Sequence, residues 1–247
     1  MESISTKLKR LKCSGGAEGF ESLNRPPNVL SKETEEALHF ILDYELNKRE
    51  DTRITKAIRD AHVPYFNASQ ETLMLTGPRK IKSQALNAIF RPFWINDSHN
   101  ILLQGVEKSG KTWVSSALAV MAIRNKKKTY FVTFDKFIED IAVASVEGKM
   151  HELYRVYDQF SVIVIDDWLE KSITDLVGNF VIDFLCKWAS EKSVILTSTM
   201  SPNEWQAKLP TSDGAAKIIQ TFCNNSYPIE LMPPAYEDAE FINMEDC

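Results

Sequence analysis

One stretch limits the fold of this chain more than any other, the glycine-rich run from Gly105 to Thr112. It reads G-V-E-K-S-G-K-T, which matches the pattern G-x-x-x-x-G-K-[ST], and it lies between a short apolar run and a helix-length segment. Glycines let successive backbone N–H groups turn toward phosphate oxygens at a helix N-terminus. The run therefore predicts a phosphate-binding loop, or P-loop, that joins a strand to a helix and binds a nucleoside triphosphate.

The chemistry of such a loop assigns roles to two of its side chains. Lys111 is expected to reach the β- and γ-phosphates, and Thr112 is expected to ligate Mg²⁺. ATP and Mg²⁺ are the expected cofactors. The predicted nucleotide-binding residues are Gly105, Val106, Glu107, Lys108, Ser109, Gly110, Lys111, Thr112 and Trp113.

Two acids, Asp166 and Asp167, follow four apolar residues, 162–165. Such a run predicts a central strand buried on both faces, and ligands of open α/β sheets bind at the carboxyl ends of the strands. We expect Asp166 to hold the metal through water and Asp167 to orient or deprotonate the attacking water. The paired acids favour hydrolysis over simple nucleotide binding. They also weigh against a small-molecule kinase, as does the absence of a recognisable arginine-rich lid.

A further strand, residues 194–198, ends in hydroxyl side chains. In an ATPase with an additional strand, a polar residue at this position contacts the γ-phosphate or the attacking water. Thr199 is the first choice for this role, and Thr197 is the second. The predicted catalytic set is Lys111, Asp166, Asp167 and Thr199.

The fold class follows from the order of elements. Strand-like runs occur at residues 101–103, 130–134, 162–165, 194–198 and 227–231, with helix-length segments between them. This alternation predicts an α/β protein with a parallel five-stranded sheet and helices on both faces. The tryptophans at 113, 168, 188 and 205 have core spacing, so packing is expected instead of stacking on nucleic-acid bases.

Four regions are predicted along the chain. Residues 1–29 contain the basic run Lys7–Lys12 and glycines, which predict a flexible arm, either a solvated tail or a DNA contact. Residues 30–80 hold a helical segment from about 31 to 61 and a linker. Residues 81–232 form the ATPase domain, which opens with a helix at about 81–90, and residues 233–247 form an acidic tail expected to aid solubility.

Two groups of basic residues are candidate DNA contacts. Each has a simpler alternative, a charged helix face for the first group and cations at a helix C-terminus for the second. The first group is Lys48, Arg49, Arg53, Lys56 and Arg59, and the second is Lys126, Lys127 and Lys128.

Composition excludes several classes of protein. The net charge is −5, the four cysteines form no C-x-x-C pair, and no apolar run is long enough to span a bilayer. These features disfavour a disulfide framework, a zinc site and a membrane protein. A cytoplasmic location is expected.

Taken together, the motifs resemble the IstB/DnaC family of AAA+ ATPases over about residues 35–231. Residues 100–118 look like its P-loop, 161–168 like its second acidic motif, and 193–205 like its sensor strand with a following turn that ends in tryptophan. Residues 45–64 are similar to its charged N-terminal helices. The resemblance implies an ATP-dependent oligomer, with ATP between subunits, that grips DNA and recruits or stimulates a transposase. The alternative is a DnaC-like loader of a replicative helicase.

The chain departs from the family pattern at two places. The family commonly has asparagine at the position of Thr199, and it usually offers an arginine near the position of Lys217. No arginine occurs after Arg155. Because an arginine finger contributes a factor of about 10³ or more to turnover, weak intrinsic hydrolysis is expected. Lys217, or Arg124 or Arg155 from a neighbouring subunit, are the candidate substitutes.

Overall fold

A computed structural model describes residues 2–26, 30–74, 88–210 and 212–231 of the chain. It divides into two compact units, Met1–Lys56 and Ala57–Cys247. That division falls inside a long helix and not after residues 29 or 80, where the composition changes. Most of the predicted helix at 81–90 and the acidic tail lie outside the described residues.

The N-terminal unit is largely helical in its described part, and two helices lie within the segment predicted as a flexible arm. Two helices, α1 (Ile4–Arg10) and α2 (Ser14–Leu23), precede α3 (Lys32–Asp60). The last of these confirms the helix predicted from about 31 to 61. Ile4 and Leu11 are buried against Leu42 of α3, with Leu8 packed beside them. Their spacing places them on one face of a helix, a pattern that the surrounding lysines conceal.

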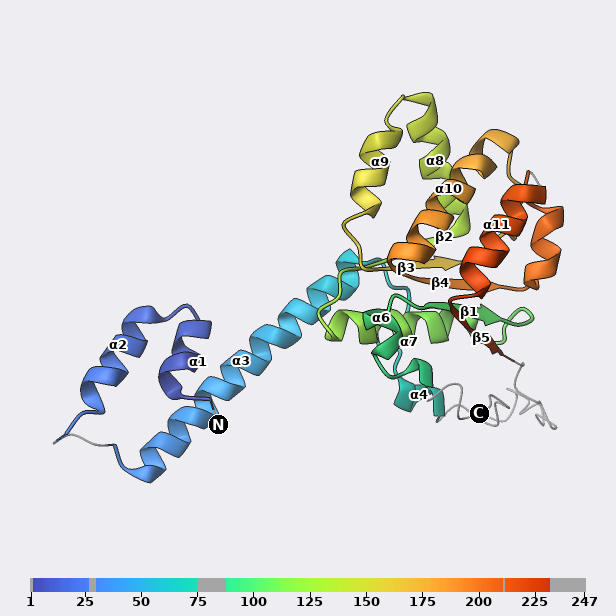
Figure 1. The fold of residues 1–247 in the computed structure, drawn as a ribbon. Coiled ribbons are helices and arrows are strands. Elements are labelled where there is room, and N and C mark those ends of the chain that lie inside the picture. The colour runs from blue at the N-terminus through green and yellow to red at the C-terminus, as the bar shows by residue number, and fades with distance from the viewer. Residues whose placement is uncertain (1, 27–29, 75–87, 211, 232–247) are drawn as a thin grey trace, which may run out of the picture. The chain divides into compact units, whose positions relative to one another are not determined.

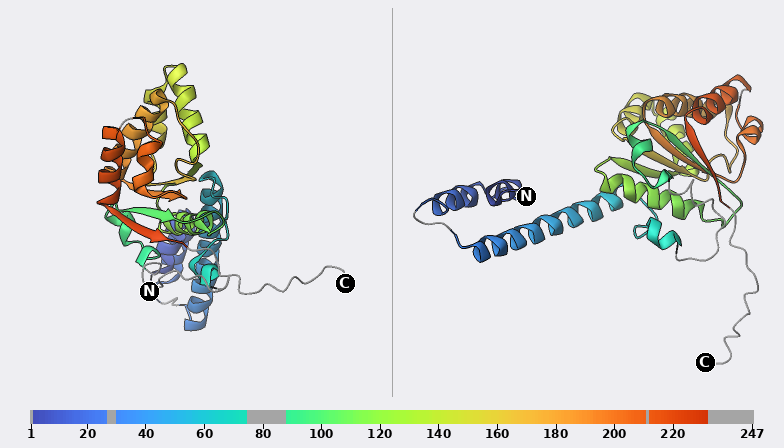
Figure 2. Two further views of the ribbon diagram at one scale, coloured as in Figure 1. Left: turned by 90° about the vertical axis from the view of Figure 1, so that its right-hand side faces the viewer. Right: turned by 60° about the horizontal axis from the view of Figure 1, so that its bottom comes forward.

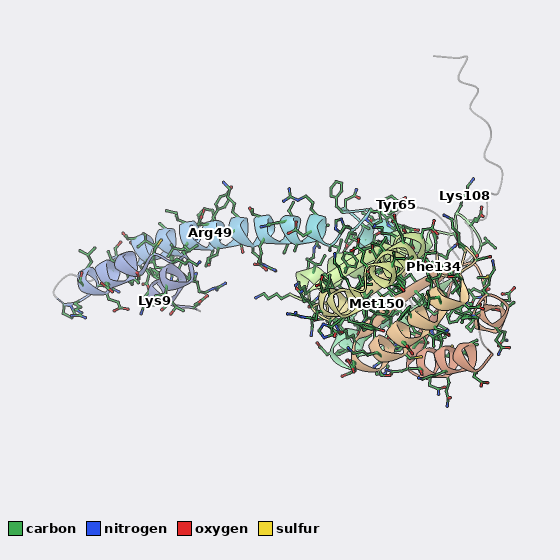
Figure 3. All side chains as sticks on the ribbon, turned by 90° about the horizontal axis from the view of Figure 1, so that it is seen from above. Lys9, Arg49, Tyr65, Lys108, Phe134 and Met150 are labelled. Carbon is green, nitrogen blue, oxygen red and sulfur yellow. The ribbon has the colours of Figure 1, made fainter. Side chains whose placement is uncertain are left out.

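One lysine of the basic run is part of this small core. Lys7 is only 4% exposed, and its ammonium donates to His39 Nδ1 at 2.8 Å and to Asp43 Oδ2 at 2.7 Å. A buried ammonium is stable only when its charge is paired and hydrogen-bonded. Lys7 therefore holds α1 on α3 and is not available to a nucleic acid. Lys9 of α1 and Arg49 of α3 lie on the surface of the same unit (Figure 3).

The second unit contains the predicted parallel sheet. Its strands are β1 (Asn100–Gln104), β2 (Thr129–Thr133), β3 (Val162–Asp166), β4 (Ser193–Ser198) and β5 (Ser226–Glu230), in the order β2-β3-β4-β1-β5. All four strand pairs are parallel, which confirms the predicted five-stranded sheet. The strand predicted at 130–134 ends one residue early, because the Thr133 hydroxyl accepts the N–H of Lys136 and begins a helix.

Helices cover both faces of this sheet (Figures 1 and 2). One face carries α7 (Lys111–Arg124), which contacts β1 to β4, with α4 (Gln70–Met74) and α6 (Phe93–Asn96) on the same side. The other face carries α8 (Phe134–Val146), α10 (Asp175–Glu191) and α11 (Ser212–Cys223). Here α9 (Met150–Tyr157) packs on α8, and a 3₁₀ helix (Pro202–Ala207) precedes α11. No helix in the described ranges is long and apolar enough to cross a membrane.

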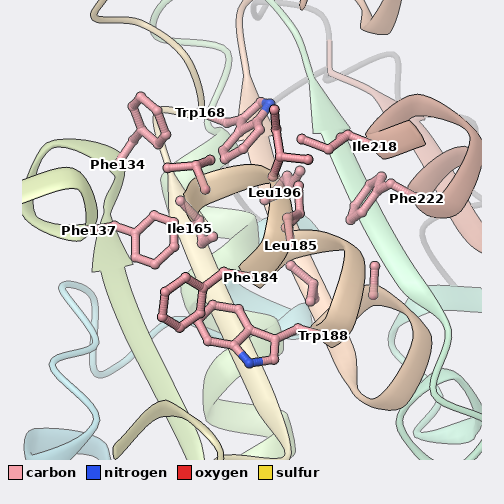
Figure 4. Close-up of a cluster of buried hydrophobic side chains, with 14 of the residues drawn as sticks. Phe134, Phe137, Ile165, Trp168, Phe184, Leu185, Trp188, Leu196, Ile218 and Phe222 are labelled. Carbon is pink, nitrogen blue, oxygen red and sulfur yellow. The ribbon is translucent and has the colours of Figure 1, made fainter. Parts of the chain in front are cut away.

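Aromatic side chains fill the core beneath α8, α10 and α11 (Figure 4). Trp168, Trp188 and Trp205 are each fully buried, which confirms the expectation that these tryptophans pack. Trp168 meets Phe134 edge-on at 5.0 Å and Trp205 at 5.9 Å between ring centroids. Trp113 is different, since it is only partly buried.

A buried asparagine ties the start of the sheet together. Asn100 is fully buried, its Nδ2 donates to the carbonyl of Ala189 at 3.0 Å, and its Oδ1 accepts the N–H of Val194 at 2.9 Å. These bonds link β1 to α10 and β4, and they satisfy two backbone groups that water cannot reach.

We expect Asn100→Ala to lower the free energy of unfolding by about 2–4 kcal/mol, because it leaves a buried donor and a buried acceptor unpaired. Urea unfolding followed by tryptophan fluorescence measures this change, since every tryptophan lies in the second unit. Asn125→Ala is the matched control, because the Asn125 amide bonds to Met121 O at an exposed position. A loss that is equal in the two variants would contradict the prediction.

Candidate nucleotide-binding site

The P-loop leaves β1 at a position that only glycine fits. The N–H of Gly105 donates to Ser198 O at 3.2 Å, which extends the β1–β4 pairing by one residue. A Cβ at Gly105 would lie 2.2 Å from Leu231 O and 2.7 Å from Ser109 Oγ. The first glycine of the motif is therefore required by close packing against the end of β5.

The loop then turns sharply into α7. Gly110 has φ 92 and stands at the N-cap of this helix, in the left-handed region that glycine adopts freely. Lys108 has φ 61, which is uncommon for a residue with a side chain and marks local strain. These two positions bend the backbone between β1 and α7.

Lys111 folds back over this bend. Its side chain is 6% exposed, and the ammonium donates to the carbonyls of Gly105 at 2.9 Å and Val106 at 3.0 Å. The charge is thereby held inside the loop, where the motif predicts the terminal phosphates.

Asp166 receives two hydroxyl donors at the end of β3. Thr112 Oγ1 donates to its Oδ2 at 2.8 Å, and Thr197 Oγ1 donates to its Oδ1 at 2.6 Å. The side chain is 3% exposed. Burial raises the pKa of this carboxyl, while the Thr197 and Thr112 hydroxyls and the charge of Lys111 act in the opposite direction.

The β4 hydroxyl that contacts Asp166 belongs to Thr197, the second choice from the sequence, and not to Thr199. The β3–β4 register pairs Ile165 with Leu196, so Asp166 and Thr197 follow side by side. Thr197 Oγ1 also accepts the N–H of Asp167 at 2.9 Å. Thr199 lies beyond the end of β4 and is partly exposed. The register between β3 and β4 therefore decides which of the two threonines contacts Asp166.

Asp167 has a left-handed backbone conformation, which lets the next residue, Trp168, enter the core. Its φ is 58, and the next residue, Trp168, is buried and accepts the Ser198 hydroxyl at its carbonyl, 3.1 Å away. Aspartate tolerates the left-handed region better than most residues. The chain therefore turns inward at Trp168 and leaves Asp167 on the wall of a cavity.

That cavity has a volume of about 490 Å³. Its lining residues come from the P-loop, the start of α7, the turn after β3 and the segment after α3, and they are Tyr65, Glu107, Lys108, Gly110, Lys111, Thr112, Trp113, Asp167 and Glu170. Figure 3 labels Tyr65 and Lys108, which lie on different segments of this unit. Ligand cavities of several hundred Å³ are typical, so the space suits a nucleotide.

Two of these lining residues, Tyr65 and Glu170, are not identified from the sequence. Tyr65 lies in the linker that precedes the P-loop, where no periodicity or motif distinguishes it. Glu170 follows Asp166 in an irregular turn, and burial together with the nearby charge of Asp167 raises the pKa of its carboxyl. Only the folded chain brings them to the loop.

The side chains around Asp166 fit a magnesium ion. Mg²⁺ prefers hard oxygen ligands and is usually held by one or two carboxylates together with water and substrate phosphates. The Thr112 hydroxyl and the Asp166 carboxylate, in direct contact, supply such a set. Within the described ranges, no group of three or more His, Cys, Asp or Glu side chains could hold a metal by itself.

Several of the candidate DNA contacts already pair with other groups of the protein. Arg49 donates to Glu45 and to Leu11 O, and Arg53 donates twice to Glu50. Arg59 Nε lies 3.9 Å from Asp60 Oδ1, and the Lys128 ammonium donates to Gln159 Oε1. Lys48, Lys56 and Lys126 are exposed, whereas Lys127 is half-buried.

None of the candidate substitutes for an arginine finger lines the cavity. Lys217 lies on α11, Arg124 ends α7, and Arg155 lies in the last turn of α9. All three are exposed. Any contribution from them to this site would have to come from a neighbouring subunit.

Solved structures with a similar fold include a replication initiation protein. Domain III of the Thermotoga maritima replication initiation protein DnaA aligns with a TM-score of 0.52 at 20% identity, covering 62% of each chain. DnaI aligns with a TM-score of 0.55 at 17% identity, covering 67% of this chain and 92% of its own. At these identities the likeness extends to the fold.

Similar sequences come from insertion sequences. A protein described as ATP-binding in insertion sequence IS1162 of Pseudomonas fluorescens is 26% identical over 85% of this chain and 87% of its own. A second, from an insertion sequence of Mycobacterium tuberculosis, is 24% identical over 81% and 80% of the two chains. The family model for IstB-like ATP-binding proteins matches residues 6–226. The match spans both compact units and most of the chain, so this protein belongs to the family of IstB-like ATP-binding proteins.

Proposed function

We propose that this protein binds and slowly hydrolyses ATP, assembles on DNA as an ATP-bridged oligomer, and assists a transposase. The observation that carries the ATPase part is the Asp166 carboxylate, which joins the hydroxyls of Thr112 and Thr197 next to the Lys111 ammonium. The part that concerns transposition is supported by relatives from insertion sequences.

In the proposed reaction the chain's own residues position a triphosphate and a water. Lys111 would exchange its loop carbonyls for phosphate oxygens. Thr112 and Asp166 would hold Mg²⁺, which would neutralise charge on the phosphates. Thr197 fixes the Asp166 carboxylate through its hydroxyl. Asp167 orients the attacking water from the cavity wall, its backbone N–H anchored on the same threonine.

DNA contact is assigned to four of the candidate lysines. Lys48 and Lys56 are exposed on α3, and after α7 Lys126 is exposed and Lys127 is half-buried. Arg49 and Arg53 already donate to neighbouring carboxylates, so a phosphate would have to compete for them. We therefore expect the lysines to contribute more to salt-dependent binding.

Slow turnover in isolation follows from the missing arginine. No arginine lies in residues 156–247, and the nearest candidate cations do not line the cavity. A lysine supplied by a neighbouring subunit is a point charge without the planar fork of arginine. Hydrolysis should therefore depend on assembly.

Light scattering after size exclusion, with and without ATP and duplex DNA, tests the proposal. The wild-type chain should form larger complexes with both ligands, and Lys111→Ala should not. Lys136→Ala is the matched control, because Lys136 is exposed on α8 and pairs with Glu139 and Asp140 away from the cavity. If the wild-type chain neither assembles nor binds DNA with ATP, the proposal is wrong. Stimulation of a replicative helicase instead of a transposase would favour the loader alternative.

The two threonines at the end of β4 give a matched pair of variants. Thr197→Val should lower ATP turnover about ten-fold or more, since it removes a hydroxyl bonded to Asp166 and to the Asp167 N–H. Thr199→Val should change turnover by less than about three-fold by the same reasoning. Steady-state phosphate release measures both. A larger effect at Thr199 would restore the choice made from the sequence.

A further inference from the structure

Two aromatic rings from distant parts of the sequence meet on the wall of the nucleotide cavity. Tyr65 comes from the linker after α3, and Trp113 comes from the first turn of α7. Their ring centroids are 4.9 Å apart at an interplanar angle of 44°. Both residues line the cavity, and Tyr65 is 42% exposed. The pair therefore presents aromatic surface to the cavity instead of closing into the core.

The position of this pair along the bound nucleotide follows from the P-loop. Lys111 and Thr112 fix the β- and γ-phosphates and the metal at the start of α7. Trp113 is the next residue of that helix and lines the same cavity, so its ring borders the space that is left for the rest of the nucleotide. Tyr65 reaches the same point from outside the P-loop.

The geometry points to Tyr65 and Trp113 as an aromatic platform that binds the nucleobase by stacking. This inference rests on the nucleotide site proposed above and adds the residues that distinguish a nucleotide from a bare polyphosphate. Stacking on an aromatic side chain grows with the area of the π-face, so a purine should bind more tightly than a pyrimidine. The four fully buried tryptophans, 94, 168, 188 and 205, do not line the cavity.

Competition binding with three probes tests the platform on the full-length chain. The probes are ATP, CTP and inorganic tripolyphosphate, each with Mg²⁺. We expect Tyr65→Ala to weaken ATP binding about ten-fold, to reduce the preference for ATP over CTP, and to leave tripolyphosphate binding unchanged. Tyr65→Phe should bind ATP as the wild type does, because it retains the ring. Phe66→Ala is the control, since this neighbouring ring is 73% exposed and does not line the cavity.

The outcomes separate this inference from the function on which it rests. A wild-type chain that binds neither ATP nor tripolyphosphate would contradict the proposed ATPase, and the platform with it. Wild-type ATP binding that persists unchanged in Tyr65→Ala would overturn the platform alone. A Tyr65→Ala variant that loses tripolyphosphate to the same extent as ATP would also overturn it, because the tyrosine would then support the loop and not the base.

Discussion

Asp166→Asn should lower the ATP turnover of the wild-type chain by at least about 100-fold, because the Mg²⁺ contribution to phosphoryl transfer depends on the carboxylate charge. The amide can still accept one hydroxyl and donate to the other, since threonine hydroxyls both donate and accept. The contacts with Thr112 and Thr197 therefore have replacements, and the site should retain its shape. Phosphate release at saturating ATP measures the loss.

The same variant should keep or raise the stability of the fold. Burial raises the pKa of Asp166, so the folded state disfavours the ionised carboxylate that Mg²⁺ binding requires. The neutral amide removes that penalty, and the free energy of unfolding should be equal to or higher than that of the wild type. Loss of turnover together with loss of stability would contradict this account and indicate a structural role.

Asp167→Asn is the matched control for the metal. Asp167 lines the cavity without the two hydroxyl contacts of its neighbour, so ATP affinity should still depend on Mg²⁺ in this variant. Its turnover should fall about 100-fold, the usual contribution of a general base. For Asp166→Asn the difference in ATP affinity with and without chelator should disappear. Equal Mg²⁺ dependence in both variants would remove Asp166 from the metal site.

Gly105→Ala should abolish measurable ATP binding and lower the free energy of unfolding by about 1–3 kcal/mol, as overpacking does. The added Cβ would lie 2.2 Å from Leu231 O. That carbonyl cannot retreat freely, because the N–H of Leu231 donates to Gln104 O at 2.7 Å and continues the β1–β5 pairing. Either the pairing or the P-loop must move.

Calorimetric ATP titration and urea unfolding give the two readouts for Gly105→Ala. Gly19→Ala is the control glycine, since a Cβ there meets nothing within 4 Å and its helix belongs to the N-terminal unit. It should bind ATP as the wild type does. If Gly105→Ala binds ATP with wild-type affinity, the close approach to Leu231 O does not constrain the P-loop, and the prediction is wrong.

The described part of the structure confirms the predictions that depend on local pattern. Five short apolar runs become the five strands, and the P-loop joins β1 to α7 as the motif requires. The helix pattern from about 31 to 61 becomes α3. Residues 1–29 are the exception. Their lysines concealed the apolar helix face that contains Ile4 and Leu11, so the sequence did not predict α1.

The sequence by itself determined the P-loop motif, the family resemblance and the elements on which the candidate site residues lie. Residue type and spacing are local, so Lys111, Thr112 and Asp166 can be assigned from neighbours along the chain. Tertiary structure decided which distant groups meet them. The β3–β4 register selects Thr197 over Thr199, and the path of the linker brings Tyr65 to Trp113. Such contacts depend on strand register and chain path, and no local pattern in a single sequence encodes either.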